Sequence, residues 1–369
     1  MTGSTQIKKT VTLKREETDR DSNMELARII AMVLITLGHF VLTFGLYQLP
    51  DCVFISSTVI SSASAYIPHI ALYSLCVVGV NLFILISGYY QIRLTWKGLF
   101  RFIALCVFYN ALVLFVDWLV QDAFTIRKLV KVFIVSKTVN WFFPDYFCLM
   151  LVSPLLNRAV EALDLKNLRR VVAILFVLNC ISGFVFRNEN VNGYNAYQFF
   201  FLYILGSWIR KDLTVRSKGK EFYLGLYLIS SIILSLLALL ILSFTDQSLR
   251  QLYYYNNPLV VTASVALFLF FTKISLKSHF INLISSTVVA VLFVQLILMR
   301  SFSPYIHAHS VYLTPLYILL IFLVAFVIEY PRKKLMEHLF SSWSQRKSGA
   351  FLNRPIISGQ SKESSSFLK

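Results

Sequence analysis

The chain alternates long apolar stretches with short clusters of charged residues. Most of these stretches have the length that a helix needs to cross a bilayer, about 20 residues. We therefore predict an all-α fold, a polytopic membrane bundle of about ten transmembrane helices. The predicted spans cover residues 24–44, 69–92, 98–120, 141–157, 171–186, 197–209, 222–244, 258–276, 281–299 and 311–330.

The positions of Lys and Arg predict the orientation of these helices. No Lys or Arg occurs between Arg28 and Arg93, so the loop at 46–68 is expected outside and the N-terminus in the cytoplasm. An even number of spans returns the C-terminus to the cytoplasm. The segment 121–140 interleaves apolar and basic residues, which predicts an amphipathic helix on the membrane surface.

Three regions follow from this pattern. Residues 1–23 are polar and lack the apolar core of a cleaved signal peptide, so they form a cytoplasmic N-terminal segment. Residues 24–334 form the transmembrane domain. Residues 335–369 are basic and Ser-rich, which predicts a cytoplasmic tail that is disordered beyond Gln345.

Composition excludes several classes of protein. Of 369 residues, 57% are hydrophobic and 14% are charged, which rules out a soluble globular protein. The net charge of +17 comes from clusters between apolar stretches, as in membrane proteins, and therefore does not indicate nucleic-acid binding. The five cysteines are scattered, and His307 and His309 lack a third ligand, so we predict neither a disulfide framework nor a metal site.

The first apolar stretch, 24–44, is unusual because it carries Glu25, Arg28 and His39. Charged groups inside a bilayer are costly and often functional. Arg28 and His39 are eleven positions apart, which on a helix brings them within about 20° of the same face and roughly 16 Å apart along the axis. The pattern predicts a cation at the mouth of a cavity and a base in the membrane interior.

Each of these residues also has a structural interpretation. His39 suits general base catalysis, but a neutral core histidine bonded to another helix is the alternative. Arg28 has the fork of donors that binds a phosphate or a carbonyl oxygen, but it is also a candidate for a snorkelling anchor at the helix end. Glu25 lies one turn from Arg28 and is expected to pair with it.

Four segments resemble one family in the order in which they occur. The stretch NMELARIIAMVLITLGH, with Arg28 and His39 in an R-x10-H arrangement, resembles the first helix of the acyltransferase 3 family of bacterial membrane acyltransferases. The later segments VNLFILISGYY, WFFPDYFCLMLVSPLLN and FFFLYILGSWIRK resemble further helices of that family. The resemblance extends over about 23–332, nearly the whole chain.

The resemblance implies an O-acetyltransferase of the bacterial plasma membrane. The donor would be acetyl-CoA as a substrate, with no bound cofactor, and the acceptor a hydroxyl of a cell-envelope or extracellular polysaccharide. The expected partners are membrane lipid, the acyl-CoA donor, the carbohydrate and other polysaccharide-biosynthesis proteins. The candidate residues are His39 and Arg28 for catalysis, Arg28, Arg93, Lys97 and Arg101 for the donor, and Asn81, Trp141, Asp145 and Gln295 for substrate.

Two departures from the family pattern leave alternatives open. Relatives often carry an R-x-x-R pair after the second helix, where this chain has only Arg101. Many have a histidine in the ninth helix, where this chain has Gln295. If that histidine takes part in the mechanism, this protein is altered or inactive; if it only binds the acceptor, the specificity is changed. Asp145 is either an acceptor ligand or a solvated carboxylate. Tyr253–Tyr255 are expected to be interface anchors in preference to the alternative, a platform for a sugar. The alternative function is a transporter or export component for a polysaccharide or lipid-linked glycan.

Overall fold

The described part of the chain is a bundle of helices. The computed structural model describes residues 22–46, 67–121, 129–130, 132–133, 141–188, 192–244, 249–302 and 313–344. The all-α membrane fold is therefore confirmed. The helices are α2 (Asn23–Phe40), η1 (Val41–Leu46), α3 (Ile67–Cys76), α4 (Gly79–Tyr90), α5 (Trp96–Gln121), α7 (Phe142–Ala162), α8 (Leu165–Phe176), η3 (Val177–Val185), α9 (Ala196–Lys211), η4 (Leu213–Arg216), α10 (Lys220–Phe244), η5 (Leu249–Tyr253), α11 (Pro258–Thr272), α12 (His279–Ser285), α13 (Val288–Phe302) and α14 (Thr314–Ser344).

The expected count of ten spans and the orientation of the termini are not confirmed. Within the described residues, seven helices are long and apolar enough to cross a membrane, or eight if α12 and α13 form one span. The predicted spans at 141–157 and 197–209 correspond to α7 and α9, which are helical but are not among these seven. The predicted ninth span is broken, because α12 and α13 meet at an angle of 51°.

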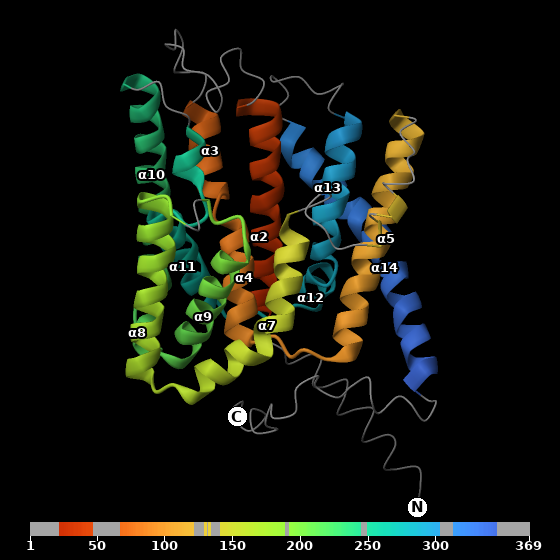
Figure 1. The fold of residues 1–369 in the computed structure, drawn as a ribbon. Helices are drawn as coiled ribbons and strands as arrows, with labels where there is room; N and C mark the ends of the chain where they lie inside the picture. Colours follow the sequence, from red (N-terminus) through yellow and green to blue (C-terminus); the bar gives the residue numbers. More distant parts are fainter. Residues whose placement is uncertain are drawn as a thin grey trace, which may run out of the picture.

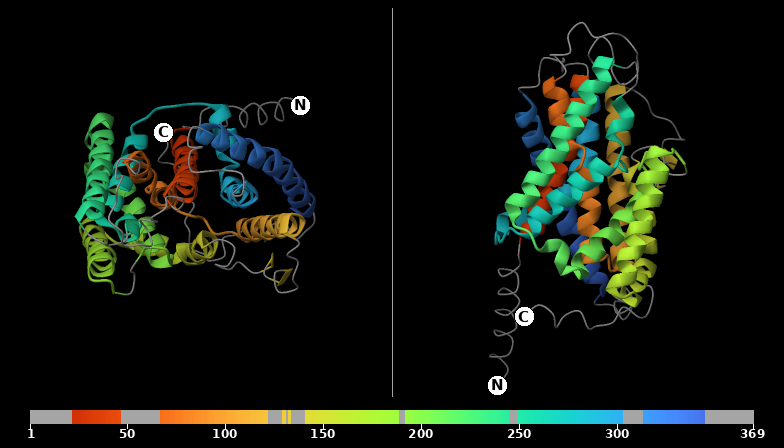
Figure 2. Two further views of the ribbon diagram at one scale, coloured as in Figure 1. Left: turned by 90° about the horizontal axis from the view of Figure 1, so that it is seen from above. Right: turned by 90° about the vertical axis from the view of Figure 1, so that its left-hand side faces the viewer.

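Helix α2 lies near the middle of the bundle. It contacts α3, α4, α11, α12, α13 and α14, and seen along the bundle it has α10 on one side and α14 on the other (Figures 1 and 2). We call the end of the bundle where α4 leads into α5 the basic end, because it carries Arg93, Lys97 and Arg101. This is the lower end in Figure 1.

Two glycines allow α4 and α9 to pack closely. A Cβ at Gly88 would overlap the carbonyl oxygen of Tyr203, and one at Gly206 would overlap that of Leu85. Small residues permit this kind of backbone approach between membrane helices. The Ser207 hydroxyl also donates to the Gly88 carbonyl at 2.8 Å. Small residues therefore allow the close approach of α4 and α9.

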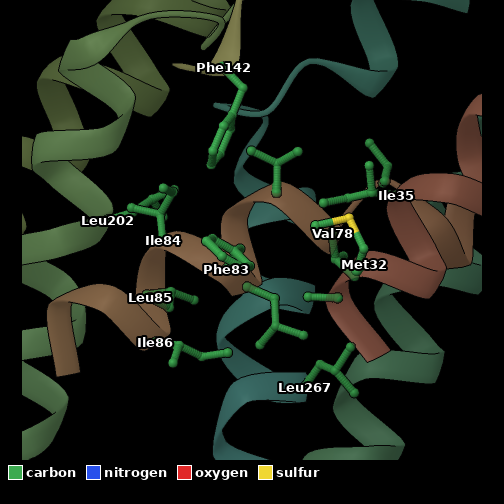
Figure 3. Packing of buried hydrophobic residues seen from close by; sticks show 14 of the residues in the cluster. Met32, Ile35, Val78, Phe83, Ile84, Leu85, Ile86, Phe142, Leu202 and Leu267 are labelled. Atoms are coloured by element: carbon green, nitrogen blue, oxygen red, sulfur yellow. The ribbon is translucent and has the colours of Figure 1, made fainter. Parts of the chain in front are cut away.

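The core around α4 is apolar and leads directly to the candidate site. Figure 3 shows Met32 and Ile35 of α2 beside α4, and Phe142 of α7 pointing toward Phe83. The rings of Phe83 and Phe142 lie 6.0 Å apart at 77°, an edge-to-face arrangement that aromatic pairs favour. This packing brings α2, α4 and α7 together around one space.

Several predictions concern residues outside the described ranges. These are most of the loop at 46–68, most of the amphipathic segment at 121–140, Cys52, His307 and His309, and most of both terminal segments, of which residues 22–23 and 335–344 are described and 335–344 continue α14.

Candidate active site

His39 lies in the last turn of α2 and borders a chamber inside the bundle. The chamber has a volume of about 240 Å³. A π-helical turn, Val41–Leu46, begins two residues later; such turns are frequent at functional sites. Four helices and the segment before α11 supply the walls. The lining residues are Met32, Ile35, His39, Val80, Phe83, Trp141, Phe142, Tyr255, Val289, Leu292 and Leu296.

A second cavity opens at the basic end. This basic-end pocket has a volume of about 360 Å³, and α5 and α14 contribute its charged side chains. Phe83, Phe142 and Val289 belong both to its wall and to that of the chamber. Its charged lining residues are Arg101, Glu329, Arg332, Lys333 and Glu337.

A third and smaller cavity, of about 80 Å³, adjoins the chamber and shares part of its lining. We call it the aromatic pocket because Tyr73, Trp141, Tyr194 and Tyr255 line it. The Tyr194 ring lies 5.1 Å from that of Trp141 and 4.6 Å from that of Tyr255. His39 lines both this pocket and the chamber.

The order of the three cavities follows from the helices that cross them. Trp141, which precedes α7, lines the aromatic pocket and the chamber. On α7 itself, Phe142 lines the chamber and the basic-end pocket, and Met150 lines the basic-end pocket. On α13 the lining passes from Val289, shared by the basic-end pocket and the chamber, to Leu296 in the chamber. The cavities therefore succeed one another along the bundle, with His39 between the chamber and the aromatic pocket.

Gln295 of α13 contacts one ring nitrogen of His39. Its amide nitrogen lies 3.2 Å from His39 Nδ1, and Gln295 is fully buried. The orientation of an amide and the tautomer of a histidine are assigned from the hydrogen-bond network. The contact occupies Nδ1 and does not involve Nε2.

Arg332 is held in place at the basic-end pocket by a buried carboxylate. Its Nε and one terminal nitrogen donate to the two oxygens of Glu329, each at 2.7 Å. The Tyr109 hydroxyl, from α5, donates to the same carboxylate at 2.9 Å. Glu329 is buried, so this bidentate pairing fixes the direction of the guanidinium.

Arg28 is paired with Glu25, as expected from their spacing. The guanidinium donates to both Glu25 oxygens at 2.7 Å, and the Ser285 hydroxyl donates to Glu25 at 2.5 Å. Arg28 also lies 5.7 Å from the centre of the Tyr90 ring. Arg28 is not among the residues that line the three cavities, and its expected position at the mouth of a cavity stays a prediction.

The other donor and substrate candidates separate into two groups. Arg101, Trp141 and Gln295 lie at the cavities or against His39. Arg93 and Lys97 lie at the same end of the bundle, but the basic-end pocket is not lined by them.

Asn81 and Asp145 are buried and are not among the residues that line the three cavities. The Asn81 amide donates to the Tyr255 carbonyl oxygen at 2.9 Å, and Gln198 donates to the same oxygen at 2.8 Å. These bonds fix the backbone that carries the Tyr255 ring. Asp145 lies in the first turn of α7 with 5% of its surface exposed, so the expectation of a solvated carboxylate is wrong.

The sequence did not single out four residues of these cavities. Arg332 and Lys333 belong to a basic run that positive-inside anchoring also explains. Tyr194 and Tyr255 come from loops, and the expectation that Tyr253–Tyr255 are interface anchors is wrong for Tyr253, which is buried, and for Tyr255, which lines two cavities. Among the described residues, no cluster of three His, Cys, Asp or Glu side chains is arranged to hold a metal.

Comparison with known proteins identifies the family. A family model described as an acyltransferase domain matches residues 21–330. Comparisons with curated proteins and with solved structures gave no significant match. The matched range contains α2 to α13 and the part of α14 up to residue 330. It therefore includes the residues that line the three cavities, except those of α14 beyond residue 330. The chain therefore belongs to the acyltransferase 3 family and is a multi-pass membrane acyltransferase.

Proposed function

We propose that the chain is an O-acyltransferase of the bacterial plasma membrane that transfers acetyl from acetyl-CoA to a hydroxyl of a cell-envelope or extracellular polysaccharide. The observation that carries the proposal is the position of His39 between an apolar chamber that adjoins a basic pocket and a pocket walled by aromatic rings. A basic pocket suits a phosphorylated donor, and an aromatic pocket suits a sugar.

The donor would enter from the basic end, which the distribution of Lys and Arg assigns to the cytoplasm. Arg101, Arg332 and Lys333 line that pocket and supply the donors that phosphate groups require. Its apolar residues, among them Phe102 and Leu105, suit the uncharged arm of CoA. The thioester would then lie in the chamber beside His39.

The reaction needs one base, which takes up a proton in the first step and releases it in the second. His39 Nε2 would take the proton of the acceptor hydroxyl as its oxygen attacks the thioester carbonyl carbon. The C–S bond breaks as the tetrahedral intermediate collapses, and the imidazolium returns the proton to the thiolate of CoA. The products are an ester and free CoA. Such a base contributes typically 10²–10⁴-fold in rate.

Arg28 has a different role from His39 in this scheme. Helix geometry separates it from His39 by roughly 16 Å along α2, so it would act on the distal part of the donor or on the conformation of the basic end. Its pairing with Glu25 ties α2 to α12 through Ser285. We therefore assign the reaction centre to His39 and a positioning role to Arg28.

The aromatic pocket supports a carbohydrate acceptor. Trp141, Tyr194 and Tyr255 present apolar ring faces together with polar N–H and O–H groups. A sugar has the complementary combination of an apolar C–H face and a rim of hydroxyls. A hydroxyl of a sugar stacked there would face His39, which lines the same pocket.

The test is the O-acetyl content of envelope polysaccharide, measured by ¹H NMR. Cells with the gene deleted are compared with cells restored by the wild-type gene or by His39→Ala at matched membrane levels. The proposal predicts that acetate is lost on deletion, returns with wild type and stays absent with His39→Ala, while polymer yield is constant. If polymer export falls on deletion and His39→Ala restores it, the chain acts in transport and the proposal is wrong.

A further inference from the structure

The strongest unexplained feature beside His39 is the amide of Gln295. With its nitrogen 3.2 Å from His39 Nδ1, its carbonyl oxygen is buried and has no hydrogen-bond partner among the described residues. A buried carbonyl without a partner is unfavourable and calls for an explanation. The oxygen and the NH₂ group of an amide are similar in size, so either of them can face the histidine ring at this position.

The two orientations of the amide have opposite consequences for His39. A neutral imidazole carries one N–H, so one ring nitrogen donates and the other accepts. If the Gln295 NH₂ group donates to Nδ1, the proton of the ring is on Nε2, which then cannot accept a proton from a substrate. If the amide is turned by 180°, its oxygen accepts from Nδ1–H and Nε2 carries a free lone pair.

We infer that Gln295 is a positioning residue that selects the Nδ1–H tautomer of His39 by presenting its carbonyl oxygen to that nitrogen. This orientation pairs the oxygen with Nδ1–H and moves the NH₂ group to the position where the oxygen has no described partner, so the preference rests on the free lone pair at Nε2 and not on the number of hydrogen bonds. It also leaves the base at Nε2, on the ring edge that is not occupied by Gln295. Carboxylates and amides perform the same task for catalytic histidines in Ser-His-Asp and Cys-His-Asn sites. The inference rests on the proposed function, which requires a base at Nε2, but the tautomer is measured without reference to acyl transfer.

The experiment reads the tautomer directly. The full chain is labelled with ¹⁵N-histidine, reconstituted in lipid nanodiscs and examined by ¹⁵N NMR, which separates protonated from unprotonated ring nitrogens. The chain has six histidines, so the difference from a His39→Ala sample assigns the signals of His39. We expect the wild type to carry the proton of neutral His39 on Nδ1.

Three substitutions test whether Gln295 is the cause. Gln295→Leu keeps the bulk but has no acceptor, and we expect the proton to move toward Nε2 and the turnover number to fall about 10²-fold, the scale of a lost base. The value of KM for the donor should stay the same. Gln295→Glu keeps an oxygen at the same reach and should preserve the Nδ1–H tautomer, whereas the shorter Gln295→Asn should not.

The outcomes separate this inference from the proposed function. A wild-type His39 with its proton on Nε2 overturns the inference, and so does a tautomer that is the same in Gln295→Leu. The wild-type spectrum decides the matter even if a variant does not fold. If the tautomer is as inferred but O-acetyl content does not depend on His39, the proposed function fails and the role of Gln295 in orienting the ring stands.

Discussion

The basic-end pocket and the His39 chamber share part of one wall but differ in chemistry. The pocket has Arg101, Arg332 and Lys333 in its lining, together with two carboxylates. The titratable residues that line the chamber are His39 and Tyr255, and the rest of its lining is apolar. Electrostatic interactions are stronger in a site that excludes water. This difference fits the proposed scheme, in which charged side chains of the basic-end pocket bind the donor and proton transfer occurs in the chamber.

The largest expected effect comes from the chamber. His39→Ala should lower the rate of transfer by about 10²–10⁴-fold, because the base is lost. Binding of CoA should be unchanged, because the proposed site for its phosphates is the basic-end pocket. Release of CoA thiol in the presence of envelope polysaccharide measures the rate, and calorimetry on the same nanodisc samples measures the affinity. A loss of CoA affinity comparable to the loss of rate would show that the two regions are not separate.

The second-largest effect is expected at the basic-end pocket, where α5 carries two basic residues whose substitutions can be compared. Arg101 lines the pocket, and Lys97 lies one turn earlier on the same helix without lining it. Arg101→Ala should weaken CoA binding by about 10–100-fold, the value of one charge-assisted hydrogen bond, and Lys97→Ala should leave it within about twofold. Equal effects of the two substitutions would indicate general surface charge instead of a phosphate site.

The aromatic pocket should give a smaller effect, confined to the acceptor. Trp141→Ala removes one wall of that pocket, and loss of an aromatic contact of about 0.5–1.5 kcal/mol corresponds to a rise of about 2–12-fold in KM for the acceptor. Affinity for CoA should not change. The measurement is a titration of envelope oligosaccharide in the same transfer assay, and a change confined to CoA affinity would contradict the acceptor role.

The smallest effect on activity is expected away from the cavities. Arg169 donates to Asp212 at 2.6 Å, and this contact holds the pKa of the buried Asp212 carboxyl at about 2. Because that pKa is below the value of about 3.9 in an unfolded chain, the contact stabilises the fold above pH 4, and the stabilisation is lost as the pH falls toward 2.

Asp212→Asn should therefore lower the melting temperature by a few degrees at pH 7 and leave the rate of transfer at permissive temperature unchanged. The difference in melting temperature between the wild type and this variant should shrink on acidification. A lower rate per folded molecule would mean that this end of α9 is coupled to the cavities.

The same comparison explains what could be predicted from sequence. The position of α2 follows from its apolar run, and the pairing of Glu25 with Arg28 follows from their spacing on one helix. His39 could be identified as a candidate because placing a polar side chain inside a membrane span costs free energy. Each of these inferences depends on residues close together in the chain.

The remaining parts of the site depend on contacts between distant segments. Arg332 lies 231 positions after Arg101 in the chain, yet both line one pocket. Gln295 faces His39 across 256 positions. Tyr255 is placed by Asn81 and Gln198, which are themselves on α4 and α9. No local pattern reports such contacts, because they are set by how the helices pack.

The central claim is that the acyl end of the donor lies beside His39 while its phosphates lie at the basic end. The most direct test is photo-crosslinking of the purified protein in nanodiscs with a CoA thioester that carries a short diazirine acyl group, followed by peptide mass spectrometry. The account predicts labelling of the chamber residues Met32, Ile35 and Leu292 that excess CoA prevents and that Arg101→Ala weakens. Labelling confined to residues outside the chamber, or labelling that CoA does not displace, would contradict it.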